Sequence, residues 1–171
     1  GKSTTPYPGE DDVNVPSRFD PATFASHPEM DAYTVTDELL KRLEANPYAL
    51  IVVNYANCDM VGHTGDMAAA TKAVEVVDDC VGRIVERLLQ LDAKILITAD
   101  HGNADQMLDY ATGMVKTSHS LNPVECIYVA RDAAGVKLVE QGILSDIAPS
   151  VLEMMGLPVP AEMTSRSLFA T

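Results

Sequence analysis

The sequence predicts an α/β fold in which a mostly parallel sheet is flanked by helices. Three short apolar runs, rich in β-branched residues, indicate buried strands at residues 49–54, 95–99 and 124–129. Between the first two runs, residues 66–90 place apolar side chains at steps of three and four, the pattern of one long amphipathic helix. Helices that alternate with continuous apolar strands are typical of βαβ units, and such units build a parallel sheet.

Two further helices are indicated by the residues that begin and end them. Thr34 or Thr36 can act as the N-cap of a helix that ends before Pro47. Ser145 can cap a last helix over residues 146–155. With the long central helix, these two supply the layers that cover the predicted sheet.

The remaining segments are expected to be loops. Residues 1–33 are rich in Pro, Gly, Asp and Ser, which indicates mostly extended chain with one short edge segment at residues 13–15. Residues 102–120 are a polar loop between the second and third strands. We interpret residues 1–171 as part of one domain with a substantial core. The chain does not begin with Met, so we expect its start to be a cut edge.

The composition argues against several classes of protein. With 12 basic and 25 acidic residues, the net charge of −13 speaks against a nucleic-acid partner, whose phosphates need a basic surface. No apolar run approaches the roughly 18 residues of a membrane-spanning helix, so no membrane partner is expected. Cys58, Cys80 and Cys126 form no CxxC motif and leave one thiol unpaired in any disulfide scheme. We therefore expect a reduced, cytoplasmic protein. Separately, we expect a monomer.

Candidate functional residues follow the predicted strands. Asp59 and His63 come after the first strand, Asp100 and His101 directly after the second, and His119 lies in the loop that leads into the third. In parallel α/β sheets, ligands bind beyond the carboxyl ends of the strands. We therefore expect these five side chains to gather in one region.

Carboxylates and neutral imidazoles together suit Mn, Zn, Fe or Mg. Asp59, His63 and His119 offer three protein ligands and leave an open position, as a catalytic metal requires. Asp100 and His101 offer only two, and this chain shows no further ligands for a second ion. Two metals a few ångströms apart could clamp a phosphoryl group and stabilise its attacking and leaving oxygens.

Each of these residues also has a simpler interpretation. A single His after a strand is usually a surface residue, and Asp59 and His63 could form only a local hydrogen bond. We interpret Cys58 as a bystander, because the other candidates are hard or borderline ligands. Possible nucleophiles in the polar loop lack a strand-to-helix elbow; they are Thr117, Ser118 and Ser120.

Three stretches, "NYANCDMVGHTGD", "ITADHGNADQM" and "KTSHSLNPVECIYV", closely resemble the cofactor-independent phosphoglycerate mutases of the alkaline phosphatase superfamily. The stretches "PYPGEDDVNVPS", "HPEMDAYTVTDELL" and "ILSDIAPSVLEMMGLPVPAEMTSRSL" match the same family in the same order. The resemblance covers nearly the whole chain, which looks like the C-terminal segment of that longer enzyme. Residues 18–26 and Cys58 differ from the sequence usual in the family, and neither difference falls on a residue that the resemblance implies as a metal ligand.

The resemblance implies an alkaline-phosphatase-like fold, of which this chain is the C-terminal part only. It implies the interconversion of 3-phosphoglycerate and 2-phosphoglycerate in glycolysis and gluconeogenesis, through a phosphoserine. Two divalent metals are implied, most often Mn, with Mg, Zn or Co as alternatives. By motif match Asp59, His63 and His119 hold one ion, and Asp100 and His101 hold the other.

The family supplies the rest of its site from segments that this sequence does not contain. An Asp and the nucleophilic Ser come from the family's N-terminal region, and an inserted transferase domain grips the small phosphoglycerate substrate. We therefore assign no catalytic residue to this chain and expect it to be inactive alone.

Two other interpretations stay open. The chain could belong to another phosphomutase or phosphatase of the superfamily, although the full wording of "NYANCDMVGHTGD" speaks against this. It could also be a metal-binding or interaction domain with no chemistry. The parent reading frame distinguishes these cases, because a mutase would encode a Ser-bearing metal motif and an inserted domain upstream.

Overall fold

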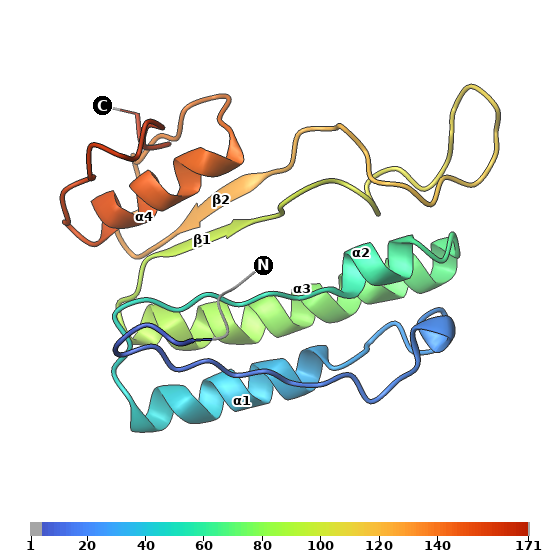
Figure 1. Ribbon diagram of the computed structural model, residues 1–171, viewed down its shortest axis with the longest axis horizontal. Coiled ribbons are helices and arrows are strands. Elements are labelled where there is room, and N and C mark those ends of the chain that lie inside the picture. The colour runs from blue at the N-terminus through green and yellow to red at the C-terminus, as the bar shows by residue number, and fades with distance from the viewer. Residues whose placement is uncertain (1–4, 171) are drawn as a thin grey trace.

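The structure, a computed structural model, describes residues 5–170 and combines a helical layer with a small sheet (Figure 1). In chain order the elements are η1 (Pro21–Thr23), α1 (Ala32–Ala45), α2 (Asn57–Gly62), α3 (Met67–Gln90), β1 (Ile95–Thr98), β2 (Cys126–Val129), η2 (Leu144–Asp146) and α4 (Ile147–Met154). The α/β class predicted from the sequence is confirmed. None of the described helices is long and apolar enough to cross a membrane.

Helix α3 is the long helix that the apolar periodicity predicted, and it lies at the centre of the helical layer. It begins where the Asp66 carboxylate accepts a hydrogen bond from the backbone N–H of Ala69, at 2.9 Å, which satisfies a donor of the first turn. Helices α1 and α2 both pack against it. Their shared core lies in two clusters of buried side chains: Phe24, Val61, Ala69 and Ala73 in one, and Ala32, Val76 and Cys80 in the other.

Helix α1 starts earlier than predicted, because neither Thr34 nor Thr36 is its cap. The residue before its first turn is Asp31, whose carboxylate accepts hydrogen bonds from the backbone N–H and the guanidinium of Arg18. The Asp31 side chain therefore caps no backbone N–H of the helix, and no local cap pattern predicts its contact with Arg18, 13 positions earlier in the chain. Its end at Asn46, next to Pro47, agrees with the prediction.

The two strands pair antiparallel, so the predicted parallel pairing is wrong for them. Ile95 lies opposite Val129 and Thr98 opposite Cys126. A parallel pair needs a long crossover, usually a helix, whereas the described residues 99–125 between the strands form a loop. The strands lie within the predicted ranges but are half-buried rather than buried.

The predicted strand at residues 49–54 is also wrong, although the segment is extended above α3 (Figure 1). Within residues 5–170 it pairs with no other strand, and Leu50 and Val52 are 54% and 85% exposed. An apolar pattern favours extended backbone, but a strand also needs a neighbour that accepts its hydrogen bonds. Residues 13–15 likewise form no strand, and residues 1–4 lie outside the described part of the chain.

The C-terminal part covers one side of the sheet. A turn of 3₁₀ helix, η2, precedes α4, so Ser145 lies inside a helical turn and is not the cap that was predicted. Asp146 is buried, and its carboxylate accepts from the backbone N–H of Ile143 at 2.9 Å. Phe169 packs edge-on against Tyr128 of β2, with ring centroids 5.1 Å apart, which places the chain end on the sheet.

The Arg18–Asp31 pair makes stability sensitive to acid. Burial raises the pKa of Asp31, but hydrogen bonds from the backbone and guanidinium of Arg18 outweigh it, so the pKa lies below its ordinary value of 3.8. Stability from this group is therefore present above pH 3.8 and is lost as the pH falls through the lowered pKa. We expect Asp31→Asn to be less stable at neutral pH and to lose less further stability on acidification. Urea unfolding over this range, with a chelator present, measures both; equal acid slopes would contradict the assignment.

A second test addresses the contact between α1 and the extended segment. Thr36 is fully buried; its hydroxyl donates to the Ala32 carbonyl at 2.8 Å and lies 2.6 Å from the hydroxyl of Tyr55. Tyr55→Phe removes one hydrogen bond, so the free energy of unfolding should fall by about 0.5–1.5 kcal/mol. Tyr110→Phe is the control, because Tyr110 is 81% exposed. An equal effect of the two substitutions would contradict a specific role of the Tyr55 hydroxyl.

Candidate metal centre

Helix α2 places two predicted ligands side by side. Residues 57–62, for which the sequence predicts no helix, are helical, and the backbone N–H of His63 donates to the Asp59 carbonyl at 3.0 Å. Residues four apart share one face of a helix. As a result, Asp59 Oδ1 lies 3.2 Å from His63 Nε2.

The loop between β1 and β2 brings the other histidines to this face. Its two arms meet at Gly102 and Ser120, where the Ser120 N–H donates to the Gly102 carbonyl at 2.8 Å. His101 and His119 flank this bridge, and their rings stack with centroids 3.8 Å apart. Residues that are 18 positions apart in sequence therefore act as neighbours.

Three ligand atoms converge closely. Asp59 Oδ1, His63 Nε2 and His119 Nε2 lie 3.1–3.2 Å from one another. Ligands bound at roughly 2.0–2.2 Å around one tetrahedral ion are separated by about 3.3–3.6 Å, close to the spacing seen here. The spacing of these three atoms therefore fits a single divalent ion.

The orientation of His63 supports this arrangement. Its Nδ1 lies 2.6 Å from the carbonyl oxygen of Thr117, and a carbonyl can only accept, so Nδ1 carries the proton and donates. In the neutral imidazole this leaves the lone pair on Nε2, the nitrogen that faces Asp59 and His119. Histidines that bind metals are commonly held in this way by a carbonyl.

His101 is the fourth side chain at the centre. Its Nδ1 is buried without a hydrogen-bond partner and lies 4.0 Å from Asp59 Oδ1. One ligand atom each from Asp59, His101 and His119 also fall within 4.8 Å of one another, so two sets of three share Asp59 and His119. We give more weight to the set with His63, because its atoms are closer together. An unpaired buried nitrogen beside a carboxylate still suits a metal ligand.

Asp100 is the most exposed of the five predicted ligands. Its side chain is 84% exposed, and Oδ1 lies 3.6 Å from His101 Nε2. The structure therefore gathers Asp59, His63, His101 and His119, with Asp100 at the edge. Ligation by all five, and their division between two ions, stays a prediction.

Sequence reasoning missed the residues that hold the loop together. Asp105 accepts hydrogen bonds from the Ser120 hydroxyl at 2.9 Å and from the Asn122 amide at 2.6 Å. Burial raises the pKa of Asp105, but these hydrogen bonds outweigh it and the pKa lies below its usual value. Ser120, considered above as a nucleophile, is thus engaged as a donor. No local sequence pattern predicts these hydrogen bonds, because Asp105 and Ser120 lie on opposite arms of the loop.

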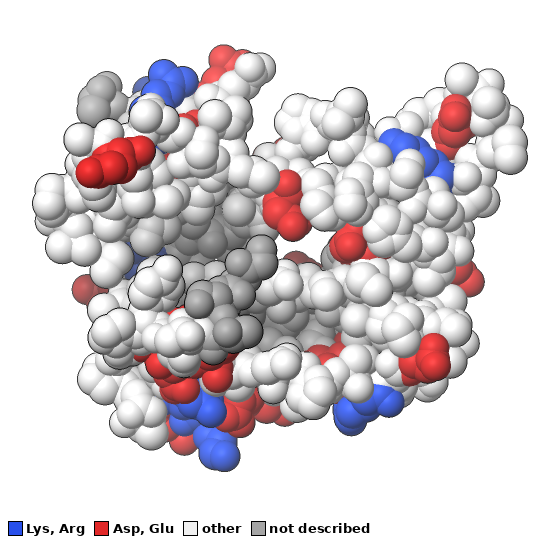
Figure 2. Space-filling view, viewed as in Figure 1, with Lys and Arg blue, Asp and Glu red and all other residues white. Residues whose placement is uncertain are grey.

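The side chains of the centre are accessible to solvent. Those of Asp59, His63, His101 and His119 are between 30% and 50% exposed. Burial raises the pKa of Cys58, which disfavours a thiolate ligand beside them. The face in Figure 2 is hollowed at its centre and carries both acidic and basic groups.

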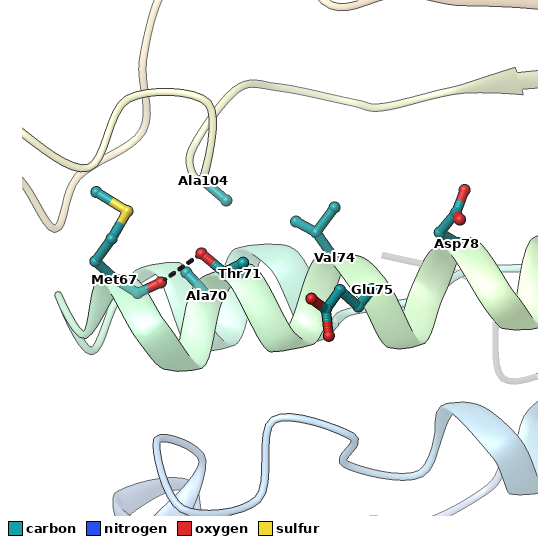
Figure 3. A pocket seen from close by; sticks show the side chains of 7 residues that line it. All are labelled: Met67, Ala70, Thr71, Val74, Glu75, Asp78 and Ala104. Atoms are coloured by element: carbon teal, nitrogen blue, oxygen red, sulfur yellow. Dashed lines mark hydrogen bonds between the residues drawn. The ribbon is translucent and has the colours of Figure 1, made fainter.

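A groove lies along one face of helix α3. It has a volume of about 370 Å³ and is lined by Met67, Ala70, Thr71, Val74, Glu75 and Asp78 of α3, with Ala104 of the loop above them (Figure 3). It contains none of the five predicted ligands. Its apolar floor continues the exposed side of α3, where Met67 and Val74 are about half exposed.

The α/β fold and the converging carboxylate and imidazoles fit a metalloenzyme. The family model of the metalloenzyme superfamily matches residues 1–159, and the chain belongs to this superfamily.

Individual relatives are phosphoglycerate mutases. The 2,3-bisphosphoglycerate-independent phosphoglycerate mutase of Clostridium novyi is 52% identical over 96% of this chain. The 2,3-bisphosphoglycerate-independent phosphoglycerate mutase 1 of Methanosarcina acetivorans is 52% identical over 95% of it. The chain spans only 32% and 31% of the lengths of these relatives. A structure of Leishmania mexicana phosphoglycerate mutase at low cobalt concentration superposes with a TM-score of 0.80 at 28% identity, covering 92% of this chain and 31% of that one.

The three close atoms give a direct test of metal binding. His63→Ala removes one ligand, so the affinity for Mn²⁺ should fall by roughly 100-fold or more. Binding by the wild-type chain should also weaken in acid, because protons compete with the metal for the imidazole nitrogens. Isothermal titration calorimetry measures both effects. His27→Ala is the matched control, because His27 stacks on Phe19 and belongs to neither set of three converging ligands. Equal affinity in His63→Ala and the wild type would rule out this site.

Proposed function

We propose that this chain is the metal-binding, C-terminal part of a cofactor-independent phosphoglycerate mutase. The observation that carries the proposal is the convergence of Asp59 Oδ1, His63 Nε2 and His119 Nε2 at 3.1–3.2 Å. The substrate follows from the named activity of relatives that are about half identical over nearly the whole chain. The reaction is the interconversion of 3-phosphoglycerate and 2-phosphoglycerate.

The residues of the centre have distinct parts in this function. When bound, a divalent ion would supply positive charge to a phosphoryl group and Lewis-acid activation of a hydroxyl. His63 is held in the correct tautomer by Thr117, and Asp59 supplies the negative ligand. The exposure of these side chains leaves room for a substrate to approach from solvent.

The finer assignments rest on the resemblance to the mutases. We propose Mn²⁺ as the metal, with Asp100 and His101 as ligands of a second ion. His101 has a buried, unpaired Nδ1, which supports its role as a ligand. The mixed carboxylate and imidazole set is compatible with Mn, and also with Zn, Mg or Co.

The exposed apolar surfaces support the proposed domain organisation. Leu50 and Val52 are exposed in an extended segment that finds no strand partner in residues 5–170, and Val74 is half exposed in the groove of α3. We propose that in the complete enzyme other segments of the phosphatase-like domain add strands here. The three thiols are free, which agrees with a cytoplasmic, glycolytic enzyme.

We expect the 171-residue chain to have no mutase activity on its own. A serine nucleophile is weak unless a metal or base activates it, and Ser120, which adjoins the centre, donates to Asp105 instead. A coupled enolase assay with 3-phosphoglycerate and saturating Mn²⁺ should give the same rate for the wild type and His119→Ala. Turnover clearly above this control would show that the chain carries its own nucleophile.

The positive test uses the longest reading frame that contains this chain. That protein should show Mn²⁺-dependent mutase activity, and His63→Ala should lower it by roughly 100-fold or more. Activity on other phosphate esters but not on phosphoglycerate would favour another phosphomutase or phosphatase. Metal binding without any phosphoryl transfer would favour a non-catalytic metal-binding domain, and either result would overturn the proposal.

A further inference from the structure

Asn103 is a buried amide that touches the metal centre without belonging to the predicted ligand set. It is 5% exposed, two residues beyond His101. Its Nδ2 donates to the side-chain Oδ1 of Asp59 at 2.7 Å and lies 3.2 Å from the backbone oxygen of the same residue. One amide group therefore holds Asp59 at two points, across 44 positions of sequence.

The chemistry of Asp59 fixes which way this amide points. Both Asp59 atoms in contact are oxygens that accept, so the nitrogen of Asn103 must face them. Turned the other way, the Asn103 oxygen would meet two acceptors. In the orientation adopted, Asn103 Oδ1 is buried without a hydrogen-bond partner. A buried acceptor left unpaired is costly, and this orientation is kept because the nitrogen reaches Asp59.

Helix α2 makes room for the same amide. A Cβ at Gly62 would lie 2.5 Å from Asn103 Oδ1 and 2.9 Å from its Cγ, so only glycine permits this approach. Glycine is unfavourable within a helix, and here its backbone lies in the ordinary helical region. Gly62 therefore serves the close contact with Asn103 rather than a turn.

A second buried amide on α2 provides a comparison. Asn57 is 2% exposed, and its Nδ2 donates at 2.9 Å to the backbone carbonyls of Pro28 and Glu29. That amide ties the N-terminal loop to α2 and touches no ligand. Asn57 and Asn103 are thus alike in chemistry and burial but differ in what they hold.

We propose that Asn103 is a positioning residue for the metal centre, which fixes the carboxylate of Asp59 so that Oδ1 faces His63 and His119. This inference rests on the proposed metal centre. Asp59 is one-third exposed on a short helix, and without this tether its side chain is free to rotate away from the two histidines. Groups that hold metal ligands in this way typically contribute 10–100-fold to affinity.

The test compares four variants of the 171-residue chain, with Co²⁺ as the probe. Asn103→Ala removes the amide, Asn103→Leu keeps nearly its shape without the donor, and Gly62→Ala displaces it by steric contact. Asn57→Ala is the matched control. Calorimetry measures Co²⁺ affinity, the visible absorption of bound Co²⁺ reports coordination geometry, and thermal unfolding in chelator reports the metal-free fold.

We expect both Asn103 variants and Gly62→Ala to bind Co²⁺ about 10–100-fold more weakly, with an altered absorption spectrum. Asn57→Ala should lower the melting temperature in chelator but keep the wild-type affinity and spectrum. Absence of Co²⁺ binding by the wild type would instead remove the proposed centre itself, and this inference with it.

Three results would overturn the role of Asn103 alone while the metal centre stands. The first is wild-type affinity and spectrum in Asn103→Leu. The second is an equal loss of affinity in Asn57→Ala, which would mean that any loosening of α2 weakens the site. The third is unfolding of both Asn103 variants in chelator when Asn57→Ala stays folded, because the amide would then be a determinant of the fold.

Discussion

The return of the loop at residues 99–125 to helix α2 is the contact on which the proposed metal centre depends. It is made by hydrogen bonds from His63 to Thr117 and from Asn103 to Asp59. Gly65, with φ of +74°, allows it, because a Cβ there would lie 2.6 Å from a side-chain carbon of Val115. Without this approach the helix would carry two ligands and the loop two others, and neither pair would suffice to bind an ion firmly.

Stability and chemistry are placed in different parts of the molecule. The buried clusters lie where α1 and α2 pack on α3, and Val61, near the end of α2, is fully buried there. That packing anchors one side of α2 while Asp59 and His63 remain accessible on the other. On the loop, the hydrogen bonds from Ser120 and Asn122 to Asp105 hold the two arms together and so support His101 and His119. A rigid support beneath accessible ligands is what a metal centre requires.

Most of the candidate ligands were visible in the sequence, but their supports were not. Asp59 and His63 are four residues apart, so helical geometry alone pairs them. His101 and His119 follow from their places near the predicted strands. Asn103, by contrast, acts on a residue 44 positions away, and its role depends on how the loop folds back. No local pattern distinguishes an asparagine that binds a carboxylate from one that only makes a turn.

Steps of three and four residues encode a helical face locally, and α3 lies at residues 67–90, where residues 66–90 are predicted. The sequence alone therefore predicts the longer helices α1, α3 and α4, but not the six-residue α2. It also determined where apolar chain would be extended. The antiparallel pairing of β1 and β2, and the lack of a strand partner for residues 49–54 within the described chain, could be learned only from the folded molecule. The physical reason is that a helix satisfies its hydrogen bonds within its own segment, whereas a strand depends on whichever segment lies beside it.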